Sequence, residues 1–164
     1  MSKIAVIYGS TTGTCETIAG TIAGKLGTSD IFSAADLDDA KIAAYDVLVL
    51  GSSTWGDGEL QDDWFDAVEV LKNADLSGKK VALFGCGDSA SYPDTFCGAI
   101  GVIYQAVKNA TVIGKGVPTD GYSFNASEAV VDGSFVGLAL DDVNESDQTE
   151  ARIDAWIAKV QSEI

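Results

Sequence analysis

The residues best suited to hold a ligand form a hydroxyl-rich loop near the start of the chain: Ser10, Thr11, Thr12, Gly13, Thr14 and Cys15. An apolar run at residues 4–8 predicts a buried strand before this loop. Apolar side chains spaced three and four residues apart predict a helix after it, and they are Cys15, Ile18, Ala19, Ile22 and Leu26. The first N–H groups of a helix lack partners within it, and the helix dipole favours negative charge there. The loop is therefore a candidate phosphate site.

Neither common phosphate-binding fingerprint occurs in this loop. It has no lysine for a P-loop, and it lacks the Gly-x-Gly-x-x-Gly spacing of a dinucleotide site. The hydroxyl groups that remain suit one terminal phosphate monoester held by neutral hydrogen bonds. A serine- and threonine-rich turn that only caps a helix is the alternative.

Two further loops follow apolar runs and carry side chains that could face a ligand. The second loop contains Ser53, Thr54, Trp55, Gly56 and Asp57, and the third contains Cys86, Gly87, Asp88, Tyr92 and Asp94. One aromatic residue in each loop, together with a phosphate site in the first, would form a slot for a flat phosphorylated ring. The alternative is that Trp55 and Tyr92 only cover their own loops.

The three loops lie in stretches without basic residues. Lysine and arginine are absent from residues 4–24, 42–71, 81–107 and 116–151. A site built this way binds a phosphate but opposes further negative charge. It would therefore disfavour the reduced form of a redox ligand that becomes anionic.

Composition narrows the possible functions. The 164 residues contain no histidine, which excludes Ser-His and Cys-His nucleophilic catalysis and imidazole metal ligation. The formal charge of −15 argues against nucleic acid and anionic membranes as partners and suits a basic protein surface. No apolar run is long enough for a membrane span. The first predicted strand begins at Ile4, which leaves no room for a signal peptide, so we expect a cytoplasmic protein with three reduced cysteines.

Apolar runs predict five strands, at residues 4–8, 30–34, 46–51, 80–84 and 111–113. Helical patterns follow most of them: Gly27 is expected to end the first helix, and Asp62 to cap one that buries Phe65, Val68 and Leu71. This alternation predicts a single α/β domain over residues 1–164, a doubly wound parallel sheet with helices on both faces. Ligands of such folds bind at the carboxyl ends of the strands, where the three loops lie. Residues 119–137 break the alternation and are interpreted as an insertion that splits the fifth strand, which resumes at residues 138–141.

The chain resembles the flavodoxins, and specifically their long-chain group. The resemblance rests on four segments in order: residues 10–14, residues 54–57, residues 87–92, and residues 120–122 with 135–140. It implies a flavodoxin-like five-stranded sheet of order 2-1-3-4-5. It also implies a monomeric, low-potential single-electron carrier, not an enzyme, with non-covalently bound FMN. The expected partners are redox proteins with basic docking surfaces, for example a ferredoxin/flavodoxin-NADP reductase.

The resemblance also implies roles for particular residues. Ser10 to Thr14 would bind the phosphate, Trp55 and Tyr92 would sandwich the ring, and Asp88 would lie at its pyrimidine edge. Backbone near Gly56 would meet the flavin N5, and rotation of the Gly56–Asp57 peptide would stabilise the half-reduced flavin. Cys15 departs from the family pattern, which usually has threonine there, so one hydroxyl donor is lost and the thiol is a candidate reactive group.

Two other functions use a similar fold. A phospho-receiver domain would need an acceptor aspartate at the end of the third strand, where this chain has Gly51, Ser52 and Ser53. An FMN-dependent quinone reductase is the stronger alternative. A monomer without hydride transfer from NAD(P)H would exclude it.

Overall fold

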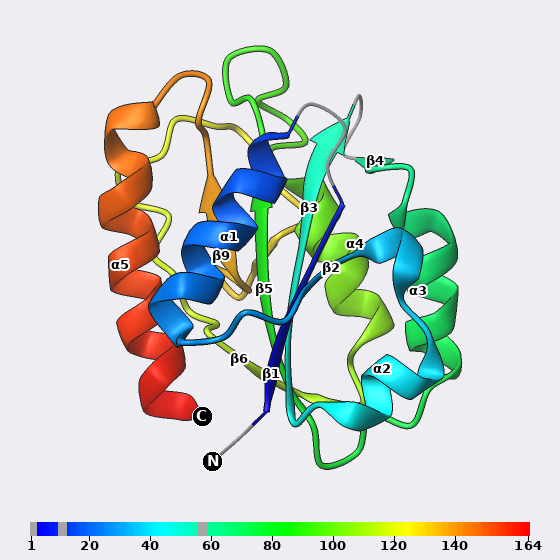
Figure 1. Ribbon diagram of the computed structural model, residues 1–164. Coiled ribbons are helices and arrows are strands. Elements are labelled where there is room, and N and C mark those ends of the chain that lie inside the picture. The colour runs from blue at the N-terminus through cyan, green and yellow to red at the C-terminus, as the bar shows by residue number, and fades with distance from the viewer. Residues whose placement is uncertain (1–2, 10–12, 56–58) are drawn as a thin grey trace.

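The computed structural model describes residues 3–9, 13–55 and 59–164 (Figure 1). Its main elements are β1 (Ile4–Gly9), α1 (Thr14–Leu26), β2 (Ile31–Ser33), α2 (Asp39–Ala44), β3 (Val47–Trp55), α3 (Trp64–Asn73), β5 (Lys80–Cys86), α4 (Gly98–Ala106), β6 (Thr111–Ile113), β9 (Leu138–Leu140) and α5 (Ser146–Glu163). Short pieces complete the chain: the 3-10 turn η1 (Ala34–Asp36), β4 (Glu59–Leu60), β7 (Val130–Val131) and β8 (Ser134–Phe135).

The central sheet has the order β2-β1-β3-β5-β6, and all of these neighbours run parallel. Counted in chain order, these five strands give 2-1-3-4-5, which confirms the predicted fold. Helices α1 and α5 cover one face, and α2, α3 and α4 lie over the other (Figure 1). Successive strand residues alternate between the two cores. On β3, Leu48 and Leu50 belong to the core under α3 and α4, whereas Val47 and Val49 pack under α1 and α5. Burial on both faces explains why the strands read as continuous apolar runs.

The fifth strand is split, as predicted. Its first half, β6, pairs with the start of β5, and its second half, β9, pairs with the end of β5. Between the two halves the chain leaves the sheet as the insertion, whose aromatic residues Tyr122, Phe124 and Phe135 pack around Phe96. The chain returns through Gly137, where a Cβ would lie 2.3 Å from the backbone oxygen of Leu83.

The predicted burial of Phe65 is wrong. Its side chain is 54% exposed, and Trp64 is buried instead, with its indole N–H donating to the Gly51 carbonyl at 2.7 Å. Helix α3 begins at Trp64 with Asp63 at its N-cap, one residue later than the expected cap at Asp62. The buried stripe at positions 64, 67, 68 and 71 has helical spacing, so the adjacent aromatic residue points to solvent.

Candidate functional site

Three strands bring the predicted ligand-binding segments to one edge of the sheet. β1, β3 and β5 are adjacent and parallel, so the loops that follow them meet at their carboxyl ends. A cavity of about 240 Å³ opens there, lined by Thr14, Ser53, Thr54, Cys86, Gly87, Asp88, Tyr92, Asp142 and Val143. All of these except Asp142 and Val143 are among the residues singled out from the sequence. The structure therefore brings residues of all three predicted loops together at one cavity.

Asp142 and Val143 were missed by the sequence analysis. They follow β9, whose last residue Leu140 pairs with Cys86 at the end of β5. The segment after β9 consequently lies beside the third loop, and Val143 is 70% exposed at the rim of the cavity. The predicted resumption of the fifth strand near residue 138 was the only sequence signal for these two residues. Placing them at the cavity also required the register of β9 against β5.

Some predicted site residues cannot be placed in the cavity. Ser10, Thr11, Thr12, Gly56 and Asp57 lie outside the described residues, and only the backbone of Trp55 is described, at the end of β3. Gly13 is the N-cap of α1 with a φ of 92°, a left-handed conformation that favours glycine. Asp94 does not line the cavity, and its carboxylate accepts a hydrogen bond from Asn125 of the insertion at 3.1 Å.

The side chain of Cys15 lies in the protein core. It is fully buried, and its Sγ lies 3.1 Å from Sγ of Cys86, in the core between α1 and the sheet. At position 15 only the backbone N–H is therefore available to a ligand. The hydrogen bond with Cys15, together with burial, raises the pKa of the Cys86 thiol, which keeps it protonated. All three cysteines are free and buried.

The third loop carries an exposed aromatic side chain, Tyr92, and a hydrogen-bonded carboxylate, Asp88. Tyr92 is 43% exposed, and its backbone N–H donates to the Asp88 carbonyl at 2.9 Å. The Asp88 carboxylate accepts hydrogen bonds from the N–H groups of Ala90 and Ser91 at 3.2 and 3.1 Å. A hydrogen bond from the Asn144 side chain, supported by these backbone donors, lowers the pKa of Asp88, so the group is ionised at neutral pH. The residues that line the cavity include two carboxylates and no lysine or arginine.

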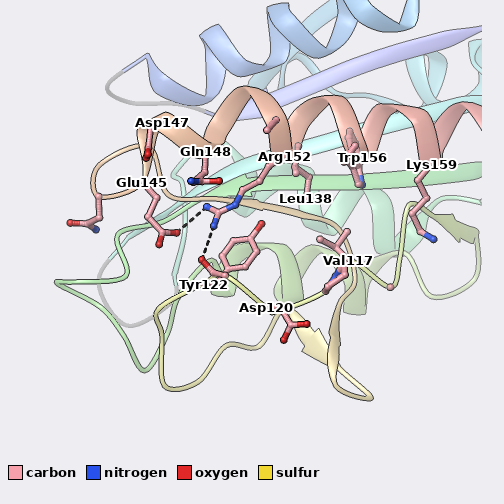
Figure 2. A pocket seen from close by; sticks show the side chains of 16 residues that line it. Val117, Asp120, Tyr122, Leu138, Glu145, Asp147, Gln148, Arg152, Trp156 and Lys159 are labelled. Carbon is pink, nitrogen blue, oxygen red and sulfur yellow. Dashed lines mark hydrogen bonds and ion pairs between the residues drawn. The ribbon is translucent and has the colours of Figure 1, made fainter.

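A larger hollow of about 670 Å³ lies elsewhere, between α5 and the insertion (Figure 2). Arg152 reaches across it from α5, with its guanidinium 3.8 Å above the ring of Tyr122 and a 3.0 Å hydrogen bond to the Gly121 carbonyl. Glu145 lies 2.9 Å from the same guanidinium in an ion pair. This hollow contains none of the residues predicted to bind a ligand, and its contacts attach the insertion to α5.

Other kinds of site are not found in the part of the chain that the structure describes. Residues 3–9, 13–55 and 59–164 contain no cluster of three or more potential metal ligands. Within the same residues, no helix is both long enough and apolar enough to cross a membrane.

Comparison with known proteins agrees with the fold. The family model described as Flavodoxin matches residues 6–156. Flavodoxin 1 of Azotobacter vinelandii is 43% identical over 99% of this chain and 98% of its own length, and flavodoxin of Synechococcus elongatus is 40% identical over 99% and 98%. The crystal structure of Fusobacterium nucleatum flavodoxin bound to flavin mononucleotide superposes with a TM-score of 0.92 at 31% identity, covering 100% of this chain and 99% of that one. The chain belongs to the flavodoxin family.

Proposed function

We propose that this protein is a low-potential single-electron carrier that binds FMN non-covalently in the cavity beside Thr14, Thr54 and Tyr92. The observation that carries the proposal is the convergence of predicted FMN-binding residues from three strand ends on one cavity. Its relatives are flavodoxins, and the Fusobacterium nucleatum flavodoxin is bound to flavin mononucleotide. Bound FMN supplies reversible one-electron chemistry, so the chain needs no catalytic residue of its own. The alternative of an FMN-dependent quinone reductase has no support among these relatives.

The side chains around the cavity fit a flat phosphorylated ring. Thr14, Ser53 and Thr54, which carry hydroxyl groups, line it, and Thr14 is the first residue of α1, where a phosphate is favoured without a basic side chain. Ser10, Thr11 and Thr12 would add hydroxyl donors to this phosphate site. The half-exposed ring of Tyr92 offers a face for stacking, and Trp55 would supply the opposite face.

The carboxylates of the cavity favour a low potential. Asp88 and Asp142 line it, and no cation among the lining residues compensates their charge. Negative charge added to a bound ring is therefore destabilised, because like charges repel more strongly in a partly desolvated site than in water. Rotation of the Gly56–Asp57 peptide, which would offer a carbonyl to a protonated flavin N5, belongs to the same proposal.

The expected partners are redox proteins with basic docking surfaces, which meet this chain as a cytoplasmic monomer. The chain has a formal charge of −15, and exposed Asp62 and Asp66 lie at the start of α3, on the sheet edge where the cavity opens. Electron transfer to a basic reductase should slow as salt rises, because the Debye length shrinks from about 10 Å at 0.1 M to about 3 Å at 1 M. Asp62→Asn with Asp66→Asn should flatten this salt dependence. Asp39→Asn, at the start of α2, is the control and should leave it unchanged.

Comparing FMN with riboflavin tests the phosphate site. The protein should bind about one FMN per chain and riboflavin much more weakly, because riboflavin lacks the phosphate. Thr14→Val keeps the shape of the side chain but removes its hydroxyl, and it should weaken FMN about tenfold while leaving riboflavin unchanged. Thr21→Val, two turns into α1, is the matched control. Equal losses of both ligands in Thr14→Val would contradict the proposed phosphate site.

A further inference from the structure

One carboxylate near the cavity is completely buried. Asp141, which follows β9, has 0% exposure, although an ionised carboxylate is costly to bury without hydrogen bonds. Its oxygens accept hydrogen bonds from the N–H and Oγ–H groups of Ser89, and from the backbone N–H of Asn144 at 3.0 Å. Burial alone would raise the pKa of Asp141, but these hydrogen bonds outweigh it and keep the pKa below its ordinary value. The buried anion therefore joins two loops: the one after β5 and the one after β9.

The split of the fifth strand explains why these loops meet. Cys86 and Leu140 are paired at the ends of β5 and β9, and the Gly87 N–H donates to the Leu140 carbonyl at 2.9 Å. The next residues of the two strands are consequently neighbours, which places Asp141 beside the loop that carries Asp88. A fifth strand that ended with β6, opposite Ala82, would not reach this position.

The side-chain amide of Asn144 makes a second connection. Its Nδ2 donates to Oδ1 of Asp88 at 2.8 Å and lies 3.1 and 3.0 Å from the two carboxylate oxygens of Asp141. One N–H₂ group therefore bridges two carboxylates that would otherwise repel each other. The bridged oxygen of Asp88 also accepts the N–H groups of Ala90 and Ser91, in the turn that leads to Tyr92.

We propose that Asp141 and Asn144 are positioning residues that fix the loop at residues 87–92 and thereby place Asp88 and Tyr92 for the flavin ring before FMN binds. The inference rests on the proposed FMN site. It adds that the segment after the split strand orders the ring-binding side of the cavity. Neither residue needs to touch the ring for this role, because each acts through Asp88 or Ser89.

Two substitutions at Asn144 test the proposal, because its side chain is exposed and its replacement should leave the fold intact. Asn144→Ala removes the bridging donor. Asn144→Asp keeps the shape but points an oxygen at two carboxylates, so it should be more damaging than alanine. Asn73→Ala is the control: it removes an amide hydrogen bond of 2.9 Å to the Glu69 carbonyl, at the end of α3 and on the opposite edge of the sheet.

The first measurement is amide hydrogen exchange of the FMN-free protein. In Asn144→Ala the amides of Ser89, Ala90 and Ser91 should exchange about tenfold faster than in the wild type, and faster still in Asn144→Asp. The control should match the wild type. Unchanged exchange in both Asn144 variants would overturn the proposal, and this result does not depend on whether FMN binds.

The second measurement compares dissociation constants for FMN and riboflavin. Asn144→Ala should weaken both ligands by a similar factor of about ten, because the ring side of the site is loosened and the phosphate side is not. A loss confined to FMN would place the effect at the phosphate and overturn the proposal. Wild-type affinity in Asn144→Asp would show that the side chain only fills space, which also overturns it. Failure of the wild-type protein to bind FMN would refute the proposed function instead.

Discussion

Arg152 should be the main attachment of the insertion to helix α5. Its guanidinium lies 3.8 Å from the centre of the Tyr122 ring, donates to the Gly121 carbonyl at 3.0 Å and pairs with Glu145 at 2.9 Å (Figure 2). The Arg152 side chain is only 12% exposed, so these contacts are largely protected from water and salt. Substitution by alanine would remove all three contacts and leave the Glu145 carboxylate unpaired.

The cost of Arg152→Ala can be worked out from these contacts. A hydrogen bond from a charged donor contributes about 1.5–3 kcal/mol. A partly desolvated cation–π contact adds about 0.5–2 kcal/mol. The ion pair adds little beyond this, because its geometry is not that of a hydrogen bond and desolvation offsets its attraction. Since contributions that share one side chain are not additive, we expect a loss of about 2–4 kcal/mol in the free energy of unfolding.

Urea unfolding followed by circular dichroism measures this loss. With a slope of about 2 kcal/mol per molar urea, the midpoint should fall by about 1–2 M. Lys25→Ala is the matched control, because it removes the 2.6 Å ion pair with Asp154 on α5, between side chains that are much more exposed. Surface ion pairs contribute little, so the control should hardly move the midpoint. Similar small shifts in both variants would refute the role assigned to Arg152.

Three other predictions concern individual side chains. Tyr92→Ala should raise the potential at which bound FMN takes up its second electron, because an electron-rich ring beside the added charge is lost. An unchanged or lower potential, measured by spectroelectrochemistry, would contradict stacking of Tyr92 on the flavin. Burial raises the pKa of Tyr122 to about 12. The folded protein therefore keeps a proton that the unfolded chain releases near pH 10. The free energy of unfolding should fall as the pH rises from about 10 to 12. The loss of stability between pH 10 and pH 12 should be smaller in Tyr122→Phe than in the wild type. If the free energy of unfolding of the two proteins showed the same pH dependence, the raised pKa of Tyr122 would be contradicted. The buried thiols of Cys15, Cys86 and Cys97 should resist iodoacetamide at pH 8 until urea exposes them, whereas rapid modification of the native protein would contradict their burial.

The sequence predicted the sheet because its strands carry strong, unambiguous patterns. β1, β3 and β5 are buried on both faces, and their continuous apolar runs have no competing helical interpretation. The split of the fifth strand was predictable for a similar reason, since an apolar segment resumes at Leu138 after a polar stretch. Phe65 and Trp64 show the limit of such patterns, because two adjacent aromatic residues at a helix start fit the apolar stripe almost equally well.

The site residues that lie at predictable strand ends could be identified from the sequence. Those whose position depends on how distant strands pair could not. Thr54 lies near the end of β3 and Gly87 directly follows β5, and the fold imposes the alignment of these two strands. Val143 was missed because its position depends on how β9 pairs with β5. The helical pattern already predicted that the Cys15 side chain is buried, because Cys15 is the first residue of the apolar stripe that continues through Ile18. That stripe correctly places its thiol in the core.

Stepwise reduction of the FMN-loaded protein, followed by absorbance, tests the account most directly. A one-electron carrier must stabilise half-reduced flavin, which free flavin in water does not accumulate. We predict that the long-wavelength absorbance of neutral, half-reduced flavin will rise to a maximum near one electron per flavin, and will fall as the second electron is added at a lower potential. Direct conversion from the oxidised to the fully reduced spectrum, without this intermediate absorbance, would contradict the assignment as a single-electron carrier.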